Sequence, residues 1–176
     1  MKHILAAAAL ILMLGVMGAA SVHAEYVLPY PGYMPGNKLY TISRLIDTLR
    51  QPFFFGNISA YKYHLGLSDK YLVEAKTLFE YKQYLLASDA LLRSDSEFAR
   101  VPVYLKLAAS EGKDVRAFVS MLREAAARHR QVLTGLQSAL PEAFEWKPEK
   151  SNATDLPIKD MLRQSIMVRN NAVLSL

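Results

Sequence analysis

The chain has 176 residues and no cysteine, and its 21 Lys and Arg residues exceed its 16 Asp and Glu residues, which gives a formal net charge of +5. The lack of cysteine excludes disulfides, thiolate metal sites, cysteine nucleophiles and lipid attachment at a cysteine. The mild positive charge permits weak attraction to anionic lipid or cell-wall polymer without requiring it.

The first 24 residues have the layout of a secretory signal peptide. A basic start at Lys2 precedes an apolar run over Ile4–Met17, and small residues then lead to a cleavage-type triplet that ends at Ala24. We therefore expect cleavage after Ala24 and an exported protein that is periplasmic, on the cell surface or secreted. The alternative is an uncleaved N-terminal anchor, although the run is shorter than the roughly 20 residues that a spanning helix needs.

Cleavage would leave residues 25–176, which have the length of one ordinary domain. It would also remove Lys2 and lower the formal net charge to +4. Export and the lack of a known binding motif argue against nucleic acid as a partner. Within this one domain we expect an arm and a short helix over 25–56, a helical bundle over 57–140, and a loop with a C-terminal helix over 141–176.

Residues 25–38 contain three prolines and two glycines, which predicts an extended, polyproline-like arm. The arm is too rich in tyrosine and aliphatic residues to be a free linker. We expect it to lie across the domain and pack against it. The alternative is a docking peptide for another protein, with Tyr26, Leu28, Tyr30 and Tyr33 as the candidate contacts.

A short helix should follow, with Asn37 as its cap and Pro52 as its stop. Its apolar residues recur at helical spacing and share one face: Leu39, Ile42, Ile46 and Leu49. The run Phe53–Phe55 predicts a core cluster at the corner between two helices. Asn57 is the expected cap of the next helix.

Three longer stretches show seam residues at alternating steps of three and four, as in helical bundles. The first seam is Ile58, Tyr61, Leu65, Ser68, Leu72, Ala75 and Phe79. The second seam is Tyr84, Ala87, Leu91, Ser94, Phe98, Val101, Leu105 and Ala108. The third seam is Val115, Val119, Leu122, Ala126, His129, Leu133, Leu136 and Leu140. Short connections between the stretches require antiparallel neighbours.

We therefore predict an all-α fold, an antiparallel up-down-up bundle of three long helices with a short helix at each end and the extended N-terminal arm. Small seam residues should let the helices approach closely. Whether the seams close within one chain or against a second copy stays open. Pro102 lies inside the second long helix and is expected to kink it rather than break it, because the seam continues past it.

The region 141–156 is polar and contains two prolines, which predicts a loop. A last helix should open at Leu156-Pro157. We expect this helix to be short enough to cap the bundle, with five residues on one side: Ile158, Met161, Leu162, Ser165 and Val168.

The opening of the predicted mature chain, YVLPYPGYMPGNKLY over residues 26–40, resembles the start of an uncharacterised bacterial and archaeal family that begins Y-x-L-P-Y-P-G-x-L-P-x-x-P-L-Y after a signal peptide. The similarity extends over about residues 25–114 and includes HLGLSDKYLVEAKTL at 64–78. Met34 replaces a usual Leu and Lys38 replaces a Pro, and neither changes the expected fold. The family is a domain of unknown function, so the resemblance implies an extracytoplasmic helical domain without implying an activity.

The sequence offers few groups for chemistry. His64 and His129 are the two histidines of the predicted mature chain, and neither has partners at metal-ligand spacing, so we expect no metal and no cofactor. We expect His129 to be buried and bonded to a neighbour. Asp69, Lys70 and Glu74 are interpreted as a solvated face. Nucleophile-elbow, phosphate-loop and zinc-protease motifs do not occur, and we expect no enzyme.

The third long helix carries four candidate contacts for an anionic surface: Arg116, Arg123, Arg128 and Arg130. An ordinary solvated face is the alternative. The sequence as a whole favours a non-enzymatic protein-interaction module of the cell envelope, with an envelope protein as partner. The alternative function is a binder of anionic cell-wall polymer or membrane surface through the basic helix. Self-association also stays open.

Overall fold

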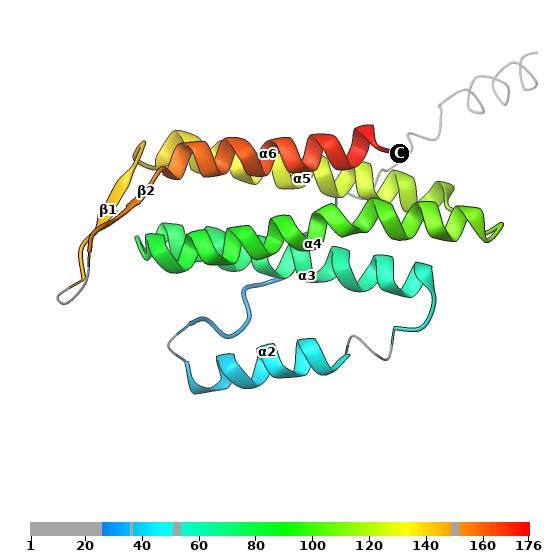
Figure 1. Cartoon of the computed structure of the whole chain (residues 1–176), viewed down its shortest axis with the longest axis horizontal. Helices are drawn as coiled ribbons and strands as arrows, with labels where there is room; N and C mark the ends of the chain where they lie inside the picture. Colours follow the sequence, from blue (N-terminus) through cyan, green and yellow to red (C-terminus); the bar gives the residue numbers. More distant parts are fainter. Residues whose placement is uncertain (1–25, 36, 51–53, 149–151) are drawn as a thin grey trace, which may run out of the picture.

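The computed structural model describes residues 26–35, 37–50, 54–148 and 152–176, and these residues are mainly helical. Four long helices pack together as a bundle in which each helix runs opposite to the one before it in the chain (Figure 1). They are α3 (Asn57–Glu80), α4 (Tyr84–Ser110), α5 (Arg116–Ala139) and α6 (Ile158–Leu174). The all-α fold predicted from the seam spacing is confirmed. The predicted signal peptide over 1–24 and the predicted stop at Pro52 lie outside the described residues.

The predicted seams close within the chain. Their small members Ala75, Ala87, Ala108 and Ala126 are completely buried, and α3 and α4 make the most extensive helix pair. Leucines of the seams fill the space between the alanines, where large side chains can alternate with small ones. Burial of this apolar surface is the main term that stabilises the bundle.

The two connections between the first three bundle helices use left-handed backbone. Lys82 has a φ of 58°, and Gly112 has a φ of 77°. The N–H of Lys113 donates to the carbonyl of Ala108 at 3.1 Å, which satisfies a carbonyl that the end of α4 would otherwise leave unpaired. Between these turns α4 continues through Pro102 without a break, as predicted.

The C-terminal helix differs from its prediction. With 17 residues, α6 lies lengthwise against both α4 and α5, so it is a fourth member of the bundle and not a short cap. Its buried positions continue past the predicted apolar face, because Arg169 and Ala172 also face the core. Because Arg169 is charged, the sequence pattern did not indicate that the apolar seam of α6 continues to Ala172.

The region predicted to be a loop contains a small antiparallel hairpin of β1 (Phe144–Trp146) and β2 (Thr154–Leu156), with Phe144 opposite Leu156. The hairpin projects beyond one end of the bundle (Figure 1). The Phe144 ring packs 4.6 Å from that of Tyr84, and Leu156 is buried. Two apolar side chains thus hold strands that are too short to show an alternating pattern in the sequence.

Before the bundle, residues 26–35 form the predicted extended arm and α2 (Lys38–Arg50) lies beside α3, on the side away from α6 (Figure 1). Asn37 caps α2 as predicted, because its Oδ1 accepts the N–H of Leu39 at 2.9 Å. The predicted Asn57 cap is wrong, since its side-chain amide donates to Glu111 at 2.5 Å. The predicted phenylalanine core is wrong in its described part, because Phe54 is 38% exposed and Phe55 is 82% exposed, while Phe53 lies outside the described residues.

Candidate functional site: the N-terminal segment and its attachment

The N-terminal segment, defined here as residues 26–50, alternates between attachment and exposure. Tyr26 and Leu28 pack against the bundle core, whereas Tyr30 is 96% exposed and Tyr33 is 50% exposed. The four candidate docking residues are therefore divided into two that hold the arm and two that face outward. The expectation that the arm packs across the domain holds for Tyr26 and Leu28 and, near the end of the arm, for Met34, whereas Tyr30 and Tyr33 between them face outward.

Tyr26 attaches the arm through a polar contact. Its hydroxyl donates to Oδ2 of Asp69 at 2.6 Å. Burial, followed by the negative charge of Asp69, raises the pKa of the Tyr26 phenol well above its ordinary value. The phenol therefore stays protonated at neutral pH, where it remains a donor to the carboxylate.

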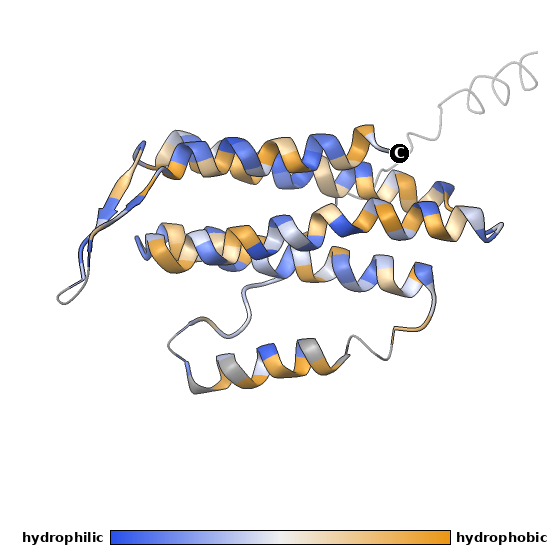
Figure 2. Ribbon diagram, in the orientation of Figure 1, coloured by the Kyte–Doolittle hydropathy of each residue, from blue (hydrophilic) through white to orange (hydrophobic). Residues whose placement is uncertain are grey.

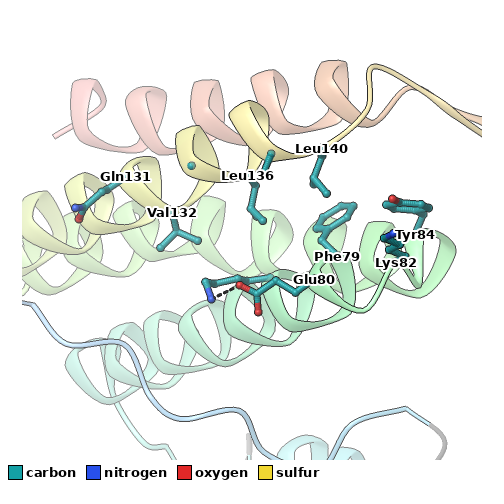
Figure 3. A pocket seen from close by; sticks show the side chains of 11 residues that line it. Phe79, Glu80, Lys82, Tyr84, Gln131, Val132, Leu136 and Leu140 are labelled. Carbon is teal, nitrogen blue, oxygen red and sulfur yellow. Dashed lines mark hydrogen bonds and ion pairs between the residues drawn. The ribbon is translucent and has the colours of Figure 1, made fainter.

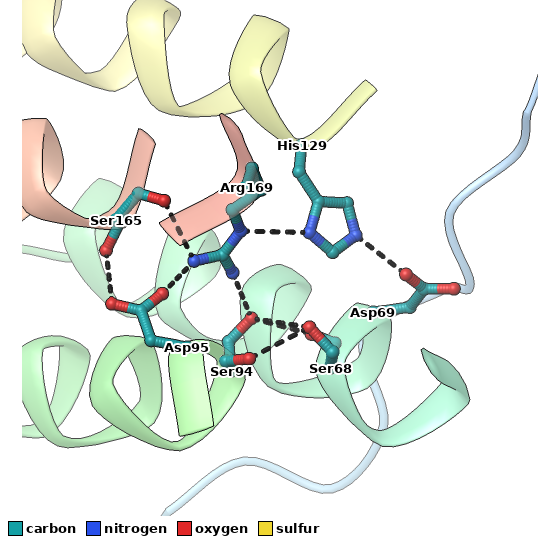
Figure 4. A network of polar contacts seen from close by, with 7 residues as sticks. All are labelled: Ser68, Asp69, Ser94, Asp95, His129, Ser165 and Arg169. Atoms are coloured by element: carbon teal, nitrogen blue, oxygen red, sulfur yellow. Dashed lines mark hydrogen bonds and ion pairs between the residues drawn. The ribbon is translucent and has the colours of Figure 1, made fainter. Parts of the chain in front are cut away.

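Asp69 connects the arm to the interior of the bundle, because its other oxygen, Oδ1, lies 2.7 Å from Nε2 of His129 (Figure 4). On the opposite side of the ring, Nε of Arg169 donates to Nδ1 of His129 at 3.3 Å. An accepting Nδ1 carries no proton, so this geometry assigns the ring proton to Nε2, which donates to Asp69. The prediction that His129 is buried and bonded to a neighbour is confirmed.

Arg169 is the centre of the remaining contacts. Its guanidinium forms an ion pair with Asp95 and donates to Oγ of Ser94 at 2.7 Å (Figure 4). Ser165 donates to the second oxygen of Asp95 at 2.6 Å. Burial lowers the pKa of Arg169 to about 9, so the group is still charged at neutral pH. We call these connected residues the buried polar network: Ser68, Asp69, Ser94, Asp95, His129, Ser165 and Arg169.

The buried polar network draws residues from all four bundle helices, and its geometry differs from that of a hydrolase. In a Ser-His-Asp triad, the ring nitrogen opposite the carboxylate accepts the proton of a serine hydroxyl. In this chain that nitrogen of His129 faces a guanidinium, and the ring is completely buried. Ser68 and Ser94 donate to each other's backbone carbonyl at 2.9 and 2.8 Å. The contacts therefore join helices and leave no activated nucleophile among these residues.

The second histidine also has partners. Nδ1 of His64 lies 2.5 Å from Glu97, and its ring stacks on Tyr104 with centroids 4.9 Å apart. Among the described residues, no three His, Asp or Glu side chains come together as a metal site would require. His64 joins α3 to α4, which is a packing role.

The predicted solvated face of α3 is wrong. Asp69 and Glu74 are buried, and Lys70 forms an ion pair with Asp47 of α2. The Tyr40 hydroxyl donates to Glu74 at 2.5 Å. Burial raises the pKa of Glu74, and the hydrogen bond from Tyr40 offsets part of this rise. This surface of α3 is covered by the polar side of α2 and by the arm.

α2 consequently turns its apolar residues away from α3. They are 42% to 58% exposed, and Figure 2 shows hydrophobic colour along the helix: Leu39, Ile42, Leu45, Ile46 and Leu49. Residues Tyr40, Ser43 and Asp47, which contact the bundle, occupy the opposite side of the helix. Contiguous exposed apolar residues of this kind mark binding surfaces.

The four arginines predicted to meet an anionic surface do not form one free cationic strip. Arg116 pairs with Asp114 at 2.8 Å, and Arg130 donates to Asn170 at 3.1 Å. Arg128 donates to Gln131 at 2.6 Å, whereas Arg123 is exposed. These internal contacts occupy donors that a phosphate or carboxylate would need, so the helix offers weak support for the predicted anionic contact.

A pocket of about 410 Å³ lies between the C-terminal turns of α3 and α5 and the start of α4 (Figure 3). Phe79, Tyr84, Leu136 and Leu140 give it apolar walls. Lys76 pairs with Glu80 at 2.6 Å, which neutralises the carboxylate that the pocket contains. Its chemistry is that of an apolar contact surface.

No family model, curated protein or solved structure matches this chain. The fold and the site define a cysteine-free helical bundle that carries an attached and partly exposed N-terminal segment. The similarity of the opening to an uncharacterised exported family stays a prediction. None of the helices in the described parts of the chain is both long enough and apolar enough to cross a membrane.

Sequence reasoning placed His129 in a seam but missed the residues that bond to it. Asp69 and Asp95 each follow a seam serine, and Arg169 lies four residues after another serine of the bundle core, Ser165. The sequence contained one indication of a polar network, namely three serines at core positions: Ser68, Ser94 and Ser165. Buried hydroxyl groups need hydrogen-bond partners. The amphipathic pattern of α2 was recognised, but such a pattern does not say which side of the helix is covered, so the exposure of its apolar side was not predicted.

Proposed function

We propose that this protein is an exported, non-enzymatic protein-interaction module of the cell envelope that binds its partner through the N-terminal segment. The observation that carries the proposal is the division of the arm into attached and exposed residues. Tyr26 and Leu28 fix the arm on the bundle, while Tyr30 and Tyr33 face outward.

This arrangement favours binding for two physical reasons. Tyrosine supplies a large contact area at a small cost in side-chain entropy, and it is enriched among the residues that dominate interface energies. An arm that is already extended and attached also loses less freedom when a partner binds. The proline residues of the arm add to this effect, because they restrict its backbone before binding.

The experiment is chemical cross-linking in intact cells of the source organism, followed by purification of the chain and mass spectrometry of captured proteins. The wild type is compared with the double variant Tyr30→Ala/Tyr33→Ala. Tyr81→Ala serves as the matched control, since Tyr81 is an exposed tyrosine at the end of α3. The same spectra identify the mature N-terminus, which export with cleavage after Ala24 places at Glu25.

We expect one dominant envelope protein with the wild type and with the Tyr81→Ala control, and its loss with the double variant. Equal capture by all three chains would show that the exposed tyrosines are not the contact. If the partner is captured by the double variant but not by the Tyr81→Ala control, the partner binds the bundle and not the arm.

A further inference from the structure

The outward side of α2 is a second surface, and it is separate from the exposed tyrosines of the arm. We infer that this side of α2 lies on the surface of an anionic phospholipid bilayer. The inference goes beyond the proposed protein docking and rests on different residues. We call the five side chains that form this surface the α2 apolar face: Leu39, Ile42, Leu45, Ile46 and Leu49.

The orientation of α2 is fixed by polar contacts with the bundle. Tyr40 donates to Glu74 at 2.5 Å, and Lys70 donates to Ser43 at 3.1 Å and pairs with Asp47. The hydroxyl of Tyr63 donates to the backbone carbonyl of Asp47 at 2.7 Å. A rotation of α2 that buried its apolar face would break these contacts and leave Glu74 buried without its donor.

Charge points to an anionic partner. The sequence of α2 contains Lys38, Arg44 and Arg50 against the single acid Asp47, and of these cations Arg44 is engaged beside the bundle, with its guanidinium carbon 5.9 Å from the centroid of the Tyr40 ring. Asp47 is already paired with Lys70 of α3, so its charge is compensated from the bundle. An amphipathic helix with one apolar side, excess cations and low overall hydrophobicity is the type that lies in the interface of an anionic bilayer.

An exposed aromatic residue also follows α2 along the chain. Phe55, beyond the C-terminal end of the helix, is 82% exposed. Tyrosine and phenylalanine are favoured at the headgroup level of membranes, where a ring is partly in lipid and partly in water. An exposed Phe55 is costly in water and is explained by such a contact.

A second copy of the chain is the competing occupant, and the area argues against it. Full burial of a Leu or Ile side chain is worth about 1.5–3 kcal/mol, at about 25 cal/mol for each Å² of apolar surface removed from water. These values correspond to about 60–120 Å² of apolar surface per side chain. Five such side chains, each about half exposed, offer roughly 150–300 Å², whereas a stable interface needs roughly 800 Å² from each partner. Partitioning into lipid has no such requirement, because the helix adds electrostatic attraction to its apolar contact.

The absence of cysteine makes the test site-specific. Full-length Ile42→Cys and Leu92→Cys chains each carry one nitroxide label. Leu92 is the matched control because it is an apolar residue of similar exposure on α4. The chains are mixed with vesicles of phosphatidylcholine alone or with one third phosphatidylglycerol, and the depth of each label is measured by electron paramagnetic resonance with oxygen and a nickel chelate as relaxants.

On anionic vesicles we expect the label at position 42 to lie below the phosphate level. On neutral vesicles the fraction of chains with an immersed label should be at least about tenfold smaller. The label at position 92 should stay in water. Adding Ile46→Glu to the Ile42→Cys chain should withdraw the label, while adding Met121→Glu, an exposed site on α5, should not. A label at position 42 that is no deeper than the label at position 92 would overturn the inference.

Sedimentation of the lipid-free chain gives the other decisive outcome. A dimer that Ile46→Glu dissociates and Met121→Glu preserves would assign the α2 apolar face to a second copy and would also overturn the inference. Neither result depends on Tyr30 or Tyr33, so the protein docking proposed above is tested separately. Loss of the envelope partner in the tyrosine variant with normal lipid contact would contradict neither proposal.

Discussion

In the four-helix bundle the apolar seam residues point inward, whereas in α2 the polar residues meet the bundle and the apolar residues stay outside. Leu91 of α4 is completely buried and Leu45 of α2 is 58% exposed, although both belong to amphipathic helices. The difference follows from the surface that each helix meets. α2 lies on Glu74 of α3, a buried acid that needs a hydrogen-bond donor, and so the polar side of α2 is the better partner.

The buried polar network links the two regions. Asp69 accepts a bond from Tyr26 of the arm and another from His129 of the bundle. Attachment of the arm therefore depends on groups at the centre of the fold. Four substitutions separate the two regions, and they are given from the largest expected effect to the smallest.

Asp95→Ala should have the largest effect. It leaves the completely buried guanidinium of Arg169 without its ion-pair partner, which costs about 3–5 kcal/mol of unfolding free energy. Urea denaturation followed by circular dichroism measures this loss. Asp89→Ala is the control, because its pair with Arg93 is on the surface and should cost at most about 1 kcal/mol. Equal losses in the two variants would contradict a structural role for the buried polar network.

Tyr26→Phe should lower the unfolding free energy by about 1–3 kcal/mol, because a buried carboxylate loses a donor. Tyr30→Phe is the control, and its exposed hydroxyl should contribute nothing measurable. The effect of Tyr26 also depends on pH. Its pKa is raised in the folded chain, so its stabilising contribution is complete below the ordinary tyrosine pKa of 10.0 and is lost as the pH rises further.

The alkaline measurement is a comparison of urea midpoints at pH 8 and pH 11. The gap between the wild type and Tyr26→Phe should narrow at the higher pH. A gap that stays constant would mean that the Tyr26 phenol does not titrate differently in the folded and unfolded chains.

Glu74→Gln tests the attachment of α2. A glutamine oxygen still accepts the Tyr40 hydroxyl, but it does not titrate. Because the pKa of Glu74 is raised in the folded chain, the wild type should gain stability relative to the variant as the pH falls from 7 toward its ordinary value of 4.5. Thermal unfolding at a series of pH values measures this gain. A relative loss of stability on acidification would show that Glu74 is stabilised as an anion.

Leu45→Ala should have the smallest effect, within about 0.5 kcal/mol of the wild type, because the side chain is mostly in water. Leu91→Ala is the matched control in the bundle and should cost about 2–5 kcal/mol. Chemical denaturation of the two variants gives the comparison. A large loss from Leu45→Ala would mean that the α2 apolar face is covered within the folded chain.

The bundle could be predicted from the sequence because its seams repeat at strict steps of three and four over three long stretches. The hairpin could not, since β1 and β2 have three residues each and are held by contacts between distant positions. The length of α6 was underestimated because Arg169 at a seam position reads as a polar break. The ion-pair partner of Arg169, Asp95, was not recognised from the sequence. Nothing in the pattern therefore indicated that the Arg169 charge could be buried.

The site was predicted in part. Tyrosine in a proline-rich opening indicated that the arm is more than a linker, but spacing alone could not divide Tyr26 from Tyr30. Tyr26 is held because its hydroxyl donates to Asp69. The helix pattern places Asp69 beside a seam, but it does not show that the arm reaches Asp69. Four of the five residues of the α2 apolar face, all except Leu45, were recognised as a pattern, and their exposure follows only from the contacts of Tyr40 and Asp47.

The central claim is that binding belongs to the N-terminal segment and that the bundle supports it. The most direct test places a photoreactive amino acid in the full-length chain in living cells, at Tyr30 or Ile42 in the N-terminal segment and at Leu92 or Met121 in the bundle. All four side chains are exposed, so access alone does not distinguish them. We predict a protein adduct at position 30, a lipid adduct at position 42 and no dominant adduct at the bundle positions. Adducts confined to positions 92 and 121 would contradict the account.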